Sequence, residues 1–154
     1  MRFEEHIEAL SRQIGVPLRV DEEGACVIAV DDMAVTLQSL QQTDSVGFWG
    51  EIGEPPPQGL EILLSAMLEA NHMFAGTGGA TISRDPGSGR FYLCRVLDLR
   101  CLDAEAFSSA LERFVNTLEA WMSLVKDYRG TKPAVAAAKS DYAPGLGTEG
   151  FLAV

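Results

Sequence analysis

The chain has 154 residues and a formal net charge of -10, so its length fits one domain and its charge argues against a nucleic-acid partner, which requires a basic surface. Thirteen acidic and three basic residues lie between Met1 and Glu69, so this first half carries the whole net charge. We expect it either to be only a solvated surface that resists aggregation or to steer a basic partner towards the protein.

The cysteines and the N-terminal stretch indicate a cytoplasmic protein. Cys26, Cys94 and Cys101 are an odd number and lie in or beside apolar runs, which is typical of reduced thiols without disulfides. The start, MRFEEHIEAL, carries acids where a signal peptide has a basic start and an apolar run, and no 18 consecutive residues are apolar. We therefore predict no membrane partner.

The first half predicts one helix and an antiparallel meander. In RFEEHIEALSRQIG, apolar residues recur at spacings of 4, 3 and 4, and Gly15 and Pro17 end the helix. Turn residues then separate four alternating stretches, in the last of which Trp49 points to the face opposite Phe48. The predicted strands cover residues 18–20, 25–30, 33–40 and 46–52.

The second half predicts helix, hairpin and helix. EPPPQG interrupts the sheet pattern because proline cannot donate to a strand ladder, and a helix begins at about Gly59. Two strands follow, with a turn over residues 85–89, and Asp103 is the predicted N-cap of a long final helix with apolar residues from Phe107 to Val125.

The glycines of GTGGAT, residues 76–81, raise the question of a phosphate site. A phosphate-binding loop follows a strand, precedes a helix and supplies a lysine. Here a helix comes first, strands come after, and no lysine lies between Glu61 and Lys126. We therefore interpret these glycines as the elbow that ends the helix before the hairpin.

Residues 131–154 are rich in Ala, Gly and Pro and lack any period, which is typical of a tail. We expect this tail to dock on its own or a neighbouring chain through Tyr142, Leu146 or the final FLAV.

The sequence contains no complete catalytic or metal-binding pattern. His6 and His72 are the only histidines and neither has a ligand partner at metal-site spacing, so we expect no metal and no cofactor. A thiolate pair between Cys94 and His72 is the remaining enzymatic alternative. We expect a protein that is not an enzyme.

The apolar residues point instead to an interface. Phe3, Ile7, Leu63 and Met67, together with Trp49, form more apolar stripes than two layers of a small domain readily hide. Such a surplus is typical of a surface that binds another protein.

Four stretches in order, PLRVDEEGACVIAVDD, FWGEIGEPPPQGLEILLSAMLEAN, GTGGATISRDPGSGRFYL and LDAEAFSSALERFVNTLEAWMSLV, resemble the class I type III secretion chaperones of the Tir-chaperone (CesT-like) family. The resemblance spans residues 1–130 and implies an α+β fold: a twisted antiparallel sheet with three helices in the order α-β-β-β-α-β-β-α. It also implies a homodimer that binds the unfolded N-terminal segment of a secreted effector and keeps it soluble and export-competent without ATP.

The resemblance also implies site residues. A dimer interface along the second helix and the neighbouring hairpin strand would contain Leu60, Leu64, Met67, Leu68 and Phe91. Effector binding by apolar patches and strand addition would use Phe3, Ile7, Leu10, Val35, Leu37, Phe48 and Trp49. The alternatives are a sensory or regulatory protein-binding domain on the same scaffold and, more remotely, a thiol-dependent enzyme.

Overall fold

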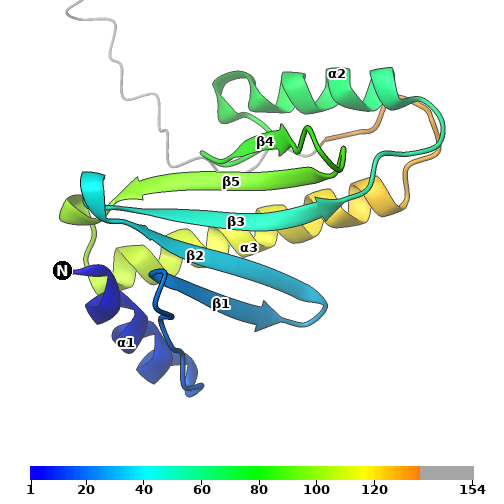
Figure 1. Ribbon diagram of the computed structural model, residues 1–154. Coiled ribbons are helices and arrows are strands. Elements are labelled where there is room, and N and C mark those ends of the chain that lie inside the picture. Colours follow the sequence, from blue (N-terminus) through cyan, green and yellow to red (C-terminus); the bar gives the residue numbers. More distant parts are fainter. Residues whose placement is uncertain (136–154) are drawn as a thin grey trace, which may run out of the picture.

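The computed structural model describes residues 1–135 and has the predicted α+β order (Figure 1). Short 3-10 turns follow β2, α2 and β5. The elements are α1 (Phe3–Ile14), β1 (Ala25–Val30), β2 (Met33–Leu40), β3 (Ser45–Gly53), α2 (Leu60–Asn71), β4 (Thr81–Arg84), β5 (Phe91–Asp98) and α3 (Ala104–Lys126).

One predicted strand, residues 18–20, is wrong. This segment is a loop, in which the Leu18 amide donates to the Ser11 hydroxyl (3.1 Å), so that amide is not used in a strand ladder. The side chains of Leu18 and Val20 still pack against the core, which explains their apolar pattern.

The five strands form one antiparallel sheet in the order β1-β2-β3-β5-β4. Because successive side chains alternate, each cross-strand row lies on one face. The row Cys26, Leu37, Phe48 and Arg95 faces inward and is buried. The helix α3 runs along this inner face behind the sheet, and α1 lies beside its start, near β1 and β2 (Figure 1).

Helix α3 begins as predicted and packs closely on β3. The Asp103 carboxylate accepts a hydrogen bond from the Ala106 amide (2.8 Å), which caps the helix. A Cβ at Gly50 would come within 2.3 Å of a Leu118 methyl carbon, so the missing side chain lets α3 approach the strand. Phe107 and Phe114 both meet Phe48 edge to face.

The glycine elbow after α2 is confirmed, because the loop leads into β4. We expected glycines to be the left-handed residues that end the helix. Gly78 and Gly79 do have positive φ, but so do the non-glycine residues Met73 and Phe74 (52° and 56°). The elbow is fixed to α3 by the Trp121 indole, which donates to the Gly76 carbonyl (2.9 Å).

After α3 the chain returns to α2, whose two ends it contacts. The Tyr128 hydroxyl donates to the Gly59 carbonyl (2.8 Å), and Lys132 pairs with Glu69 (3.1 Å). The predicted docking residues Tyr142, Leu146 and residues 151–154 lie outside the described residues. Within residues 1–135, no helix combines the length and apolarity that crossing a bilayer requires.

Candidate protein-binding site

The outer face of the sheet carries apolar side chains, and none of the described helices covers it (Figure 1). Val27 and Val96 are about 60% exposed (61% and 59%), and Trp49 and Tyr92 are half-buried. Val27, Thr36, Trp49, Cys94 and Thr81 form one row across all five strands. An apolar face of this extent is a candidate docking surface.

The indole of Trp49 reaches back over Gly47 of its own strand. A Cβ at Gly47 would come within 2.0 Å of the six-membered ring, so the ring occupies the space above that glycine. The contact with Gly47 leaves Trp49 half-buried on the outer face. The predicted orientation of Trp49, opposite the buried Phe48, is confirmed.

Strand β1 forms one edge of the sheet. At this edge Ala25 hydrogen-bonds to Asp21 through both of its backbone groups. The Ala25 carbonyl accepts from the Asp21 amide, and the Ala25 N–H donates to the Asp21 carboxylate (2.8 Å each). Since backbone groups of alternate residues point to the same side in an antiparallel pair, Val27 and Ala29 also point their N–H and C=O groups to this edge. No hydrogen bond within residues 1–135 fills these four groups.

The opposite edge, β4, is blocked. The Asn71 side chain at the end of α2 accepts from the Ile82 amide (2.8 Å) and donates to the Ile82 carbonyl (3.1 Å). One amide side chain therefore takes the place that a residue of another strand would occupy. The sequence reasoning missed this residue, because nothing in the local pattern distinguishes it from an ordinary helix-end asparagine.

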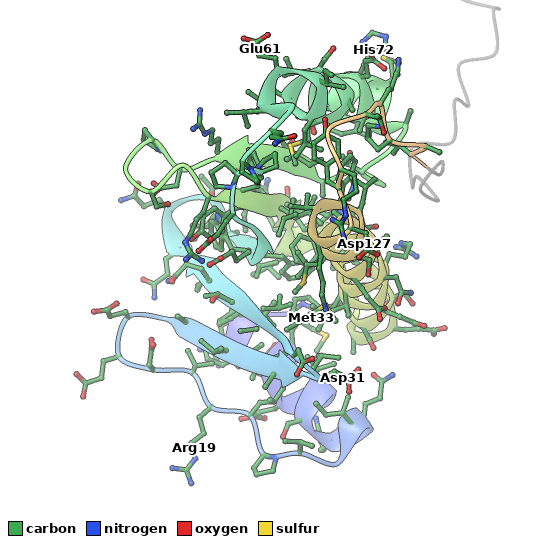
Figure 2. All side chains as sticks on the ribbon, turned by 90° about the vertical axis from the view of Figure 1, so that its right-hand side faces the viewer. Arg19, Asp31, Met33, Glu61, His72 and Asp127 are labelled. Carbon is green, nitrogen blue, oxygen red and sulfur yellow. The ribbon has the colours of Figure 1, made fainter. Side chains whose placement is uncertain are left out.

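Carboxylates flank the open edge. Asp21, Glu22 and Glu23 precede β1, and Asp31 and Asp32 form its turn into β2, which lies far from α2 in Figure 2. All five side chains belong to exposed residues. The open edge of β1 thus lies in a strongly negative environment that favours a basic partner.

Two arginines elsewhere in the described chain pair with carboxylates. Arg90 contacts both Glu51 and Glu54, and these carboxylates raise the pKa of its guanidinium. Arg100 holds the pKa of Asp98 down to about 2, chiefly through the side-chain hydrogen bonds between them. Both pairs are solvated, so they fix local geometry more than they add stability.

The exposed flank of α2 carries a second apolar stripe. Leu60, Leu64 and Leu68 are spaced by four residues and therefore lie along one side of the helix. Leu60 and Leu64 are half-buried, and Leu68 is 69% exposed. Met67 and Phe91 face the core of this chain instead, and the predicted dimer seam of Leu60, Leu64, Met67, Leu68 and Phe91 stays a prediction.

The structure also places the predicted effector-binding residues. The six that are buried between the sheet and the helices are Phe3, Ile7, Leu10, Val35, Leu37 and Phe48; the seventh, Trp49, is half-buried on the outer face. The idea that Phe3, Ile7, Leu63 and Met67 form an apolar surplus is wrong, because this single chain buries all four. Exposed large apolar side chains lie on β1 and β5, on α2 and the turn after it, and around both ends of α1.

The thiols form no catalytic arrangement within the described part of the chain. Cys26, Cys94 and Cys101 are free, and Cys94 lies 3.5 Å from the Ser83 hydroxyl on the outer face. Burial raises the pKa of Cys26, which makes that thiol less reactive. Residues 1–135 hold no cluster of His, Cys, Asp and Glu suited to a metal ion.

Several solved structures share this fold. The chain is similar to a chain of the ExsC–ExsE complex (TM-score 0.67, 21% identity, covering 81% of this chain and 97% of that one) and to one of the HopA1–SchA chaperone–effector complex (0.65, 20%, 82% and 94%). It is also similar to a chain of the Yersinia pestis type III secretion chaperone SycH with a YscM2 fragment (0.62, 16%, 76% and 97%). A search of curated proteins gave no match.

The sequence itself matches a family model. The Tir chaperone protein (CesT) family model aligns with residues 5–122, which is most of the described chain and includes the whole sheet. The chain is therefore a member of the Tir chaperone protein (CesT) family.

Proposed function

We propose that this protein is a cytoplasmic chaperone that binds the unfolded N-terminal segment of a type III secreted effector and keeps it soluble and competent for export. The observation that carries the proposal is the open edge of β1 beside the uncovered outer face of the sheet. An extended client would pair with Val27 and Ala29 at the edge and place alternate side chains on the outer face beside Trp49.

The difference between the two sheet edges supports pairing of a client at β1. Asn71 already fills the backbone groups of Ile82 on β4, whereas no residue in the range 1–135 hydrogen-bonds to the outward backbone groups of Val27 and Ala29 on β1. The acids around β1 would draw in basic client segments, so the association rate would fall as salt is added.

Binding by this route requires no nucleotide. Covering apolar client side chains contributes roughly 25 cal/mol per Å2 of buried apolar surface before the cost of ordering the client is subtracted. A chaperone of this kind holds its client by equilibrium binding alone, which is the basis for proposing ATP-independent action.

We further propose that the protein works as a homodimer joined along Leu60, Leu64 and Leu68. A stripe of leucines on one flank of a helix is suited to pairing with the same stripe of a second copy, because a two-fold interface places identical patches together. Two copies would then offer two β1 edges to one client chain.

Co-expression with the product of the adjacent open reading frame, as the candidate client, tests the proposal. Purification through a tag on this chain should retain the client, and limited proteolysis should leave a protected segment within its first hundred or so residues. Omitting ATP should make no difference. Retention of the client only as a folded protein, with no protected N-terminal segment, would support the regulatory alternative and contradict the chaperone proposal.

A further inference from the structure

The imidazole of His6 is buried in the contact between α1 and α3 without a hydrogen-bond partner. The side chain is 1% exposed, and neither Nδ1 nor Nε2 has a partner among residues 1–135. The ring stacks on Phe107 of α3, with ring centroids 4.7 Å apart and planes 19° apart. A neutral imidazole has one N–H donor and one acceptor, so both are unsatisfied here.

The surroundings of His6 favour its neutral form. Phe3, Ile7 and Leu10 lie on the same buried side of α1 as His6. The Phe107 ring in turn contacts the Phe48 ring in the sheet. Burial lowers the pKa of His6, and the α-amino group of Met1 lowers it further. Two acidic groups oppose this: Glu5 on α1 and Asp103 at the start of α3 both raise the pKa of His6.

The side chains of Glu5 and Cys26 keep one charge state near pH 6. The Arg2 amide donates to the Glu5 carboxylate (2.9 Å) and lowers the pKa of Glu5, so this acid stays charged near neutral pH. On the sheet's inner face, burial raises the pKa of Cys26, so this thiol stays neutral. Near pH 6, the ordinary pKa values leave only histidine to change its charge within this contact.

We infer that His6 is an acid-sensitive latch, whose protonation releases α1 from α3 and uncovers the apolar inner side of α1. A charged imidazolium has two N–H donors and a full charge, and neither nitrogen has a hydrogen-bond partner among residues 1–135 in the docked state. Release lets the ring reach water. The inference does not depend on the proposed function, because it concerns the chain without any client.

The direction with pH follows from linkage. The docked state binds fewer protons than the released state, in which His6 has its ordinary pKa of about 6.5. Docking is therefore strongest above about pH 6.5 and weakens as the pH falls below that value. Between pH 7.5 and 5.5 the released fraction should rise by up to about tenfold, which is the limit for one such group.

Hydrogen exchange on the client-free chain tests the latch. Protection factors of α1 amides, corrected for the intrinsic effect of pH, should fall by up to about tenfold from pH 7.5 to 5.5, while those of α3 stay constant. His6→Leu should remove this pH-dependent fall in α1 protection. If His6→Leu does not fold, His6→Phe serves as the second variant, because it keeps an aromatic ring against Phe107. His72→Gln is the matched control, because His72 is exposed just after the end of α2, at the opposite end of the molecule from α1 (Figure 2).

The result that supports the inference is a fall confined to α1, present in the wild type and in His72→Gln and absent from the His6 variants. Unchanged α1 protection in the wild type would overturn it. So would an equal fall in the His6 variants, or a loss of protection that spreads equally over α3.

Discussion

Trp49 and Gly47 are two residues apart on the same strand, and the indole of the first fills the space that a side chain of the second would take. The approach is close enough, at 2.0 Å from a Cβ position, that any residue other than glycine must displace the ring. The position of the Trp49 indole on the outer face therefore depends on the missing side chain at Gly47.

Trp49→Ala should weaken client binding at least tenfold, because a half-exposed tryptophan at the centre of a contact surface is a typical binding hot spot. Stability should fall by only about 1 kcal/mol, since the ring is not part of the core. Fluorescence titration with the client's N-terminal segment and chemical denaturation measure the two effects. The matched control is Trp121→Ala, which removes a buried, hydrogen-bonded indole and should cost about 3 to 5 kcal/mol.

The role of the glycine is tested by a double-mutant cycle. Gly47→Ala should reduce client binding by moving the indole, and it should add nothing in the Trp49→Ala background, because the group it displaces is then gone. Full additivity of the two changes would mean that Gly47 acts through something other than Trp49. A loss of stability in Trp49→Ala as large as that in Trp121→Ala would mean that Trp49 belongs to the core.

The two apolar neighbours on α2 should respond oppositely to a charge. Leu68→Glu places a carboxylate on the exposed stripe and should yield monomer with nearly unchanged stability, whereas Met67→Glu buries a charge in the core of this chain and should unfold it. Light scattering and thermal melting distinguish these outcomes. Ser65→Glu, on an exposed part of the same helix, should change neither; a persistent dimer in Leu68→Glu would remove the leucine stripe from the interface.

The order of helices and strands was predictable because it rests on periodicity. Alternating apolar residues predicted the bounds of β1 and β2 without error. The 4-3-4 spacing of apolar residues from Phe107 predicted α3, and its N-cap is Asp103 as expected. The segment 18–20 failed because its apolar residues serve the core from a loop, and a three-residue pattern cannot distinguish that from a strand.

The site was less predictable, for two physical reasons. An apolar stripe such as Phe3, Ile7 and Leu10 tells that a helix side is buried, but it does not tell whether the same chain or a partner buries it. Successive side chains of a strand also point to opposite faces, so an error of one residue changes the face. The predicted contact residue Phe91 points to the inner side of β5, whereas its neighbour Tyr92 points outward. The blocking role of Asn71 depends on a contact eleven residues away.

Asn71→Ala should lower stability by about 1 to 3 kcal/mol, because it leaves the N–H and C=O of Ile82 without their partner in a partly buried position. It should also open β4 to pairing with other chains and so increase aggregation. Urea denaturation and light scattering at rising concentration measure these effects. Asn116→Ala, at an exposed position on α3, is the matched control and should leave both unchanged.

Proline substitutions at neighbouring positions of β1 separate the open edge from the sheet interior. The N–H of Val27 points to the open edge, so Val27→Pro removes a donor that the folded chain does not use and should lower stability by about 1 kcal/mol. The same change should abolish pairing with a client strand. Ile28 points its N–H to β2, so Ile28→Pro breaks the ladder and should cost about 3 kcal/mol or more.

Client binding and urea denaturation of the two variants measure the effects, and Val27→Thr is the control, because it keeps both the N–H and the β-branched shape. Val27→Thr should bind the client within a few-fold of the wild type, since the apolar contact changes little compared with the loss of a backbone donor. If Val27→Pro folds and still binds the client with wild-type affinity, strand addition at β1 is excluded. The client would then be held by side-chain contacts on the outer face alone.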